Sequence, residues 1–225
     1  MSTWDTALAA WAFDAFKQFV PYRHMLEDLK RVLNPTQEQL VLDAGCGTGN
    51  ISSLLLRQGV RVVGLDNSPF MLKRARKKGG RSLALCLGDL NTSLPFRSQT
   101  FDAVVSIHSL YLLEDLLRSI QELRRVVKCG GKVIIVHPKP MGLWPAVKYH
   151  FAGGELKPIM TSLLPHNLLR FAIIILDSAM KAEKEYQRNF LTEQEFIKLL
   201  EESGLKVCST LTTYGGISTV VVARR

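Results

Sequence analysis

The stretch whose residue types and spacing most clearly indicate a ligand-binding site is an aspartate followed by three glycines. Gly45, Gly47 and Gly49 follow Asp43 between an apolar, strand-like run and a helix-like one. Glycines at this spacing allow a tight turn and let a ligand approach the backbone without meeting side chains. A dinucleotide fingerprint needs its third glycine at position 50, which is Asn50 here. The pattern therefore argues against a nicotinamide oxidoreductase, and the carboxylate favours a cationic group on the ligand over a pyrophosphate.

Two further aspartates recur at the same spacing, since Asp66 and Asp89 each follow the preceding acid by 23 residues. Each is predicted to end a strand. A carboxylate after the second strand can accept hydrogen bonds from both hydroxyls of a ribose, and it would repel a 2′-phosphate. A carboxylate after the third strand can accept from an adenine amino group. With Asp43, the three acids predict a ligand made of an amino acid joined to an adenosine, without a phosphate.

Strand-like and helix-like segments alternate around these residues, which predicts parallel β-α-β units in an α/β sheet covered on both faces. Strands are expected over 39–44, 60–65, 83–87, 101–106 and 132–136, with helices over 22–33, 50–58 and 114–127. Asn67 or Ser68 is expected to cap a further helix that has Pro69 in its first turn. The helix over 114–127 is expected to stop at the glycine pair 130–131.

The alternation resumes near the end of the chain, after residue 190. Thr192 and Glu195 have capping-box spacing at the start of a helix that is expected to end near Ser203. Two β-like runs, 205–211 and 217–223, follow with a Tyr-Gly-Gly turn between them. The ending predicts an antiparallel pair of strands added to a parallel sheet.

Five segments in register resemble the successive motifs of class I S-adenosylmethionine-dependent methyltransferases, in the small-molecule subgroup often called methyltransferase type 11. They are DAGCGTG at 43–49, GLDNSPFML at 64–72, GDL at 88–90, LPF at 94–96 with FD at 101–102, and LRRVVKCGG at 123–131. The resemblance covers 38–137 and, more weakly, 192–223. It departs at Cys129, where the family usually has proline, and this is a change in a loop.

The resemblance implies a Rossmann-like α/β fold with seven strands, mostly parallel and with the last strand antiparallel. It implies S-adenosylmethionine as methyl donor and a small-molecule acceptor. We expect one methyltransferase domain over 1–225, with an N-terminal helical lid (1–36), a cofactor-binding core (37–137), a helical acceptor-binding insert after the fifth strand (138–190), and a C-terminal helix and β-hairpin (191–225).

Carried over residue by residue, the resemblance assigns one set of residues to the cofactor: Asp43, Gly45, Cys46, Gly47, Thr48, Gly49, Asp66, Asn67, Met71, Asp89, Leu90 and Tyr22. Asp66 would hold the ribose, and Asn67 and Met71 would flank the adenine. Asp89 and the Leu90 backbone N–H would read the adenine edge. Core packing is the alternative role for Met71. Tyr22 is expected either to close a lid over the cofactor or to pack in a helix.

The methyl acceptor is expected beyond the carboxyl ends of the strands, where His108 and His137 are predicted to lie. Transfer from a sulfonium needs the acceptor atom in line with the sulfur, and it needs a base only when the acceptor must lose a proton. His108 is the first candidate base, because an ordinary imidazole pKa suits that task. The alternative, on which we settle, is that His108 shapes the pocket. His137 is the second candidate.

The segment 138–190 breaks the alternation and is rich in aromatic and aliphatic residues. Residues expected to bind the acceptor are Tyr111, Trp144, Tyr149 and His150. This apolar content implies an aromatic or lipophilic acceptor. Two alternatives remain for the insert, a homodimer face and a peripheral membrane contact, because basic residues border its apolar run.

The net charge of +9, from 29 basic and 20 acidic residues, raises the question of anionic partners. Six basic residues share one helix-like stretch, which we interpret as a solvated face: Lys73, Arg74, Arg76, Lys77, Lys78 and Arg81. An RNA or DNA methyltransferase is an alternative function. It lacks support because the chain has neither an Asp/Asn-Pro-Pro-aromatic run after the fourth strand nor a Pro-Cys nucleophile. A non-catalytic relative that binds the cofactor or a partner is the other alternative.

The four cysteines are scattered and form no CxxC pair: Cys46, Cys86, Cys129 and Cys208. This argues against structural zinc and against a disulfide framework, so no metal site is predicted. The start of the chain lacks the pattern of a signal peptide, and the longest apolar runs are too short to span a bilayer. We therefore expect a cytoplasmic protein.

Overall fold

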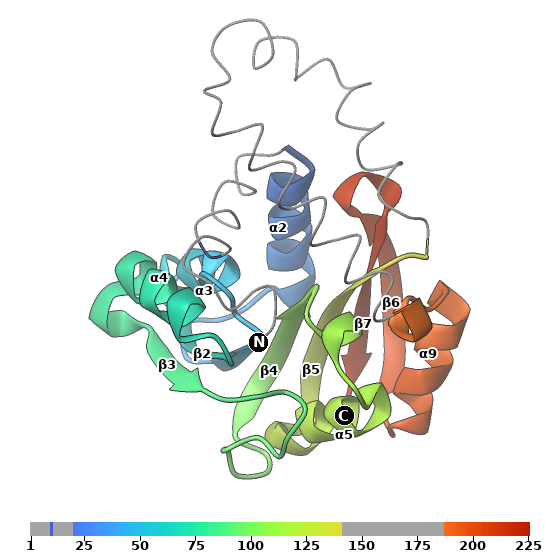
Figure 1. The fold of residues 1–225 in the computed structure, drawn as a ribbon. Helices are drawn as coiled ribbons and strands as arrows, with labels where there is room; N and C mark the ends of the chain where they lie inside the picture. The colour runs from blue at the N-terminus through green and yellow to red at the C-terminus, as the bar shows by residue number, and fades with distance from the viewer. Residues whose placement is uncertain (1–9, 11–19, 141–186) are drawn as a thin grey trace, which may run out of the picture.

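The computed structural model describes residue 10, residues 20–140 and residues 187–225. Within these ranges, seven strands form one sheet in the order β3-β2-β1-β4-β5-β7-β6 (Figure 1). Their bounds are β1 Leu40–Ala44, β2 Arg61–Asp66, β3 Ala84–Leu87, β4 Phe101–Ile107, β5 Val127–Pro138, β6 Lys206–Thr213 and β7 Ser218–Arg224. The predicted α/β architecture is confirmed.

The strand directions also match the prediction. β1 to β5 pair in parallel, whereas β7 is antiparallel to both of its neighbours, β5 and β6. The two C-terminal runs are therefore part of the main sheet, with the last strand inserted between β5 and β6. Because β7 runs backwards, the turn that precedes it lies at the same edge as the carboxyl ends of the parallel strands.

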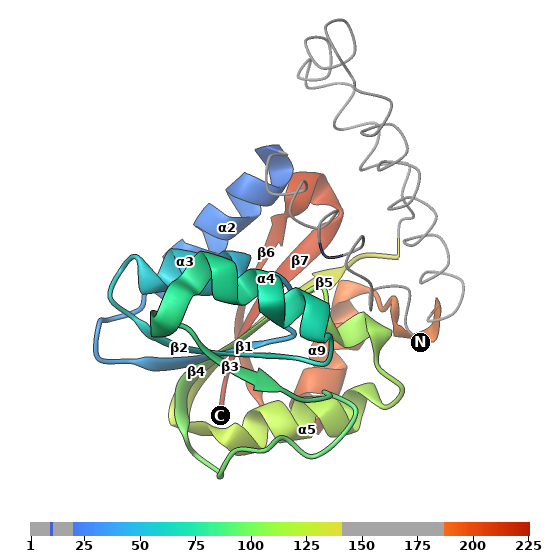
Figure 2. The same ribbon diagram turned by 60° about the vertical axis from the view of Figure 1, so that its left-hand side comes forward.

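Helices cover both faces of the sheet (Figure 2). One face carries α2 (Val20–Leu33), α3 (Asn50–Leu56) and α4 (Pro69–Gly79), and the other carries α5 (Leu116–Val126) and α9 (Glu193–Glu202). Each face has its own cluster of buried apolar side chains. This is the two-sided burial that near-continuous apolar strands require.

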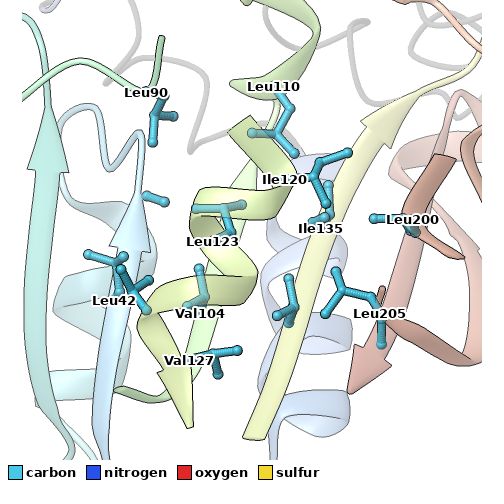
Figure 3. Close-up of a cluster of buried hydrophobic side chains, with 14 of the residues drawn as sticks. Leu42, Leu90, Val104, Leu110, Ile120, Leu123, Val127, Ile135, Leu200 and Leu205 are labelled. Atoms are coloured by element: carbon cyan, nitrogen blue, oxygen red, sulfur yellow. The ribbon is translucent and has the colours of Figure 1, made fainter. Parts of the chain in front are cut away.

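The cluster under α5 and α9 joins four elements in one packed layer (Figure 3). Leu123 of α5 and Leu200 of α9 are fully buried and lie in the same cluster as Leu42 of β1 and Ile135 of β5. Removing a buried leucine of this kind costs about 2–5 kcal/mol. The sheet edge that carries the candidate site is thus supported by a rigid core.

Two helix starts follow the predicted capping chemistry. The Ser68 hydroxyl accepts the Met71 N–H at 3.4 Å, with Pro69 in the first turn of α4. Thr192 and Glu195 form the reciprocal capping box at the start of α9. Both caps are local in sequence, which explains why sequence spacing was sufficient to find them.

The end of α5 differs from the prediction that the glycine pair stops it. The helix ends at Val126, and Val127 already has extended backbone and pairs with Phe101 as the first residue of β5. Strand pairing ends the helix before the chain reaches Gly130, whose φ of 75° serves a turn inside the long β5 segment instead.

Several predicted residues lie outside the described ranges. Most of the helical insert expected over 138–190 falls within 141–186, and so do Trp144, Tyr149 and His150. Among the described residues, no helix is both long and apolar enough to cross a bilayer.

Candidate functional site

The glycine turn between β1 and α3 has the backbone that its sequence predicts. Gly45, Gly47 and Gly49 have φ values of 75°, 52° and 75°, in the left-handed region that favours glycine. The N–H groups of Gly45 and Cys46 both donate to the carbonyl of Leu65, at 2.8 and 2.9 Å. These two hydrogen bonds hold the turn against the carboxyl end of β2.

The same turn touches the loop that follows β4. A Cβ placed on Gly45 would lie 2.5 Å from the Cβ of Ser109, so no other residue fits without a shift. The hydroxyls of Ser106 and Ser109 donate to the carbonyl of Ala44 at 2.9 and 3.2 Å. The candidate cofactor turn and the candidate acceptor loop therefore form one contiguous edge.

Asp66, the last residue of β2, spans the turn and the next helix. One of its oxygens accepts the Gly47 N–H at 2.8 Å, and the other accepts the Ser68 N–H at 2.9 Å. A carboxylate oxygen can accept more than one hydrogen bond, which is the chemistry that ribose hydroxyls require. The side chain is held in place before a ligand arrives.

Asp43 lies in β1 and is 1% exposed. Its carboxyl accepts the hydroxyl proton of Ser52 at 2.5 Å. Burial above all, together with the nearby charge of Asp66, raises the pKa of Asp43 to about 7, although the hydrogen bonds from Ser52 act in the opposite direction. A cationic ligand group beside this carboxyl would favour its ionised form, as the predicted ammonium contact requires.

Asp89 and Leu90 lie beyond the strand rather than at its end. β3 ends at Leu87, so the prediction that Asp89 ends this strand is wrong by two residues, because Gly88 already leaves the sheet. One Asp89 oxygen accepts from the backbone and side-chain nitrogens of Asn91, at 2.9 and 3.2 Å. Leu90 is buried. Their contact with an adenine stays a prediction.

Lys78 of α4 reaches the glycine turn, which the sequence pattern did not predict. Its ammonium donates to the Thr48 hydroxyl and to the Asn50 side-chain oxygen, both at 2.6 Å. The Asn50 amide in turn donates to the Tyr22 hydroxyl of α2 at 3.0 Å. Arg76 likewise donates to two backbone carbonyls. The basic stretch is thus not simply a solvated face, because at least these two cations bind within the fold.

The remaining residues of the predicted cofactor set divide by exposure. Cys46 and Met71 are buried, whereas Asn67 is exposed. The Cys46 sulfur packs so closely on β2 that a Cβ on Gly64 would lie 2.9 Å from it. Burial raises the pKa of the Cys46 thiol well above its ordinary value, so the thiol stays protonated, and the contact of Cys46 with the cofactor stays a prediction. Met71 packs in α4, and its contact with an adenine stays a prediction.

On the acceptor side, His108 follows β4 with a left-handed backbone, φ 49°. The ring Nε2 lies 2.9 Å from the hydroxyl of Ser218, the first residue of β7. The backbone N–H of His108 donates to the Val136 carbonyl at 3.0 Å. Burial lowers the pKa of His108 to about 4. An imidazole with this pKa is neutral at pH 7 and is a weak base. This favours the pocket-shaping role of His108 over the role of a general base.

Tyr214 forms the other wall beside His108 and was not singled out from the sequence. It opens the turn η4 (Tyr214–Gly216), and its ring centroid lies 5.3 Å from that of His108 and 6.3 Å from that of Tyr22. The only available signal was an aromatic residue before two glycines in a predicted hairpin. Nothing in the spacing showed that this hairpin returns to His108.

Tyr111, predicted to bind the acceptor, lies in the short helix η2 (Leu110–Leu112) after β4. Its ring centroid is 5.0 Å from that of Phe190, and burial raises its pKa to about 12. Tyr111 thus stays protonated at neutral pH and lies at the predicted edge of the sheet.

His137, the second histidine, is 3% exposed and near the end of β5. Its ring stacks on Phe196 with centroids 4.1 Å apart, and its Nε2 accepts the Leu191 N–H at 3.4 Å. Burial first, and then the charge of His108, lowers the pKa of His137 to about 3. These contacts indicate a packing role, and its role in catalysis stays a prediction.

Known proteins are similar to this chain in sequence and in fold. A family model described as "Methyltransferase domain" matches residues 42–135, the segment that carries the glycine turn, Asp66, Asp89 and most of β5. Residues 42–135 thus match the class I S-adenosylmethionine-dependent methyltransferases, and the order of the described strands is typical of their fold. Members of this family use S-adenosylmethionine, and the strand-end carboxylates and the open glycine turn fit its amino-acid and ribose parts.

Two curated relatives are demethylmenaquinone methyltransferases. That of Thermobifida fusca (strain YX) is 42% identical over 101 residues, or 43% of this chain and 42% of the relative. That of Thermotoga maritima is 28% identical over 200 residues, 86% of this chain and 80% of the relative. The matches span only 42 to 52% of the length of the first three curated relatives.

A solved complex between the Haloferax volcanii Trm112 methyltransferase activator and a putative methyltransferase contains a similar fold. The similarity has a TM-score of 0.67 at 18% identity and covers 98% of this chain and 97% of that one. At this identity the match supports the methyltransferase fold alone.

Proposed function

We propose that this methyltransferase transfers a methyl group from S-adenosylmethionine to a lipophilic aromatic acceptor of the demethylmenaquinone type. The observation that carries the proposal is the fixed Asp66 carboxylate beside the glycine turn, with the buried Asp43 next to it. When bound, the cofactor supplies its methyl group as an electrophile on the sulfonium.

The residues of the turn would bind and orient the donor. Asp43 would accept from the ammonium of the methionine part, and Asp66 would accept from the ribose hydroxyls. Because Asp66 is already held by two backbone N–H groups, little side-chain freedom remains to be lost on binding. Lys78 and Asn50 would keep the turn in shape from the side of α4.

The acceptor side would act by position and exclusion of water rather than by strong base chemistry. The pKa of His108 is lowered by burial, and its Nε2 is engaged by Ser218. Orientation of two reactants can supply much of a rate enhancement, because it replaces a bimolecular encounter by a fixed geometry. A ring carbon or a readily ionised hydroxyl needs no strong base from the protein.

The nature of the acceptor is supported by two independent features. The sequence of 138–190, which we assign to the acceptor pocket, is rich in aromatic and aliphatic residues. Two relatives that match this chain are described as demethylmenaquinone methyltransferases, whose named substrate is a lipophilic ring system. A small-molecule acceptor is accordingly preferred over a macromolecular one.

The test is a transfer assay with methyl-labelled S-adenosylmethionine and a short-chain demethylmenaquinol, alongside calorimetry with S-adenosylhomocysteine. We expect saturable product binding and labelled methyl on the ring. Product binding without labelled quinol would reject this acceptor class, and absent product binding would reject the function altogether.

RNA methylation is the second candidate, and the net charge of +9 is the observation in its favour. Ribosomal RNA is therefore included as an acceptor in the same assay. At least two cations of the basic stretch, Arg76 and Lys78, are committed to contacts inside the fold, which reduces the charge available to a phosphate backbone. We expect no labelled RNA.

A further inference from the structure

Three polar side-chain atoms at the acceptor edge make no hydrogen bond to any residue that the structure describes. They are Nδ1 of His108, whose Nε2 is held by Ser218, and the hydroxyls of Tyr111 and Tyr214. Across the described residues, Nδ1 of His137 is the one fully buried side-chain polar atom without a partner. Each of the three atoms is therefore at least partly accessible, although the side chains that carry them are partly buried.

These atoms come from separate parts of the chain to one place. The Tyr214 ring, in the turn between β6 and β7, lies 5.3 Å from the His108 ring after β4. Tyr111 lies three residues after His108 in the same loop region, and after burial its nearby hydroxyl is the second cause that raises the pKa of Tyr214. Convergence of unused polar groups on a largely apolar region is typical of a ligand site.

The fold holds two of these side chains rigidly. His108 and Tyr214 have φ values of 49° and 51°, a backbone that is unfavourable for a bulky aromatic residue. Ser218 fixes the far nitrogen of His108, and Tyr22 packs on the other side of Tyr214. Strained residues in mutual contact mark functional positions more often than chance, because the surrounding structure must maintain them.

At neutral pH all three groups are uncharged. Burial lowers the pKa of His108 to about 4 and raises that of Tyr111 to about 12, and it raises that of Tyr214 further still. The two phenol O–H groups can donate to a carbonyl, hydroxyl or phenolate oxygen, and so can His108 Nδ1 in the tautomer whose Nε2 accepts from the Ser218 hydroxyl. They offer no charge with which to hold an ammonium group.

We propose that His108 Nδ1, Tyr111 Oη and Tyr214 Oη form a polar subsite that binds oxygen substituents on the ring of the methyl acceptor. The inference rests on the proposed function and adds the residues that recognise the ring: they select a phenol, quinol or quinone over a charged ammonium compound or a plain hydrocarbon. Tyr214 is a residue of this subsite that the sequence pattern did not predict.

The experiment compares two probes of similar shape, 1-naphthol and 1-methylnaphthalene, titrated into the full-length protein saturated with S-adenosylhomocysteine. We expect naphthol to bind about 10-fold more tightly. Tyr111→Phe and Tyr214→Phe are each expected to weaken naphthol binding about 3- to 10-fold, the usual range for one neutral hydrogen bond. Binding of methylnaphthalene should not change, since the rings remain.

His24→Gln is the matched control, because His24 is an exposed residue of α2 outside the subsite. It should leave both affinities unchanged. Equal binding of the two probes, binding of neither, or unchanged naphthol affinity in both phenylalanine variants would each overturn the subsite.

The binding of S-adenosylhomocysteine, measured first, separates the two levels of inference. Normal product binding without discrimination between the probes removes the subsite and leaves the proposed function in place. Loss of product binding in the wild-type protein removes both.

Discussion

The two halves of the sheet edge use opposite chemistry. On the β1–β3 side, carboxylates and backbone N–H groups meet, with Asp66 bridging the turn and α4 and Asp43 buried beside Ser52. On the β4–β7 side, the polar groups are uncharged at neutral pH and carried by aromatic rings. The first half is suited to a small zwitterionic nucleoside, and the second to a neutral ring.

The halves also differ in how the chain assembles them. The cofactor half draws on short stretches at the ends of β1, β2 and β3, within positions 43–90 of the chain. The acceptor half joins His108 to Ser218 across 110 positions, because β7 runs antiparallel beside β5 and returns its first residue to the carboxyl edge. Mutations should therefore affect charge and cofactor binding in one half, and shape and acceptor binding in the other.

The largest expected effect concerns the buried acid of the cofactor half. The folded pKa of Asp43 is about 7, above its unfolded value of about 3.9, so its protonated form is favoured by folding. Its contribution to stability is full below about pH 4 and is lost as pH rises through about 7. Asp43→Asn should thus be more stable than wild type by up to about 4 kcal/mol near pH 8.5, measured by urea denaturation.

Near pH 4 the two proteins should have similar free energies of unfolding, because Asp43 is then protonated in the folded state and largely so in the unfolded one. A difference that is the same at both pH values would contradict the raised pKa. The same variant should bind S-adenosylhomocysteine less tightly, since a neutral amide cannot pair with an ammonium group.

The second effect tests the contact between the glycine turn and the loop after β4, where the two halves meet. Gly45→Ala must place a left-handed alanine with its Cβ 2.5 Å from that of Ser109. We expect a loss of about 2–4 kcal/mol in the free energy of unfolding, from backbone strain together with overpacking.

Gly130→Ala is the matched control for Gly45→Ala. Gly130 has the same φ of 75°, and a Cβ added there would meet no atom within 4 Å. This variant should lose only about 1–2 kcal/mol, the cost of the left-handed backbone alone. Equal losses in the two variants would mean that the contact with Ser109 does not matter.

What the sequence could predict follows the same division. The Ser68 cap, the Thr192 box, the glycine turn and the strand-end position of Asp66 depend on residues a few positions apart, and all were found. Spacing also predicted an antiparallel pair at the end of the chain. The family resemblance added that the last strand is antiparallel, and the insertion of β7 between β5 and β6 was not predicted.

Contacts between distant elements could not be predicted in this way. Lys78 looked like one more cation of a solvated helix, yet it donates to Thr48 across 30 positions. Tyr214 looked like a turn residue, and its contact with His108 depends on the placement of β7. The pKa of His108 depends on burial by the whole fold, so its ordinary value of about 6.5 was a poor guide.

The third effect is a loss of cofactor affinity. Asp66→Ala removes a charged acceptor for the ribose and should weaken S-adenosylhomocysteine binding by about 10- to 150-fold, or about 1.4–3 kcal/mol, in calorimetry. Asp66→Asn, which retains one acceptor oxygen for the Gly47 N–H, should lose less. Wild-type affinity in the alanine variant would remove the ribose assignment, and Tyr111→Phe should leave this affinity unchanged if the halves are separate.

The smallest effect distinguishes a shaping histidine from a base. Because burial holds the pKa of His108 near 4, the imidazole is neutral from about pH 6 to 8, and the rate should not rise through a histidine pKa there. His108→Ala should raise the acceptor KM about 3- to 10-fold and leave kcat within about 3-fold. His108→Asn should recover part of that loss, since asparagine accepts a left-handed backbone and keeps a polar atom close to the ring. A fall of about 100-fold in kcat for both variants, with a wild-type rate that rises through a pKa of about 6–7, would instead make His108 the base and give the acceptor half a proton-transfer role.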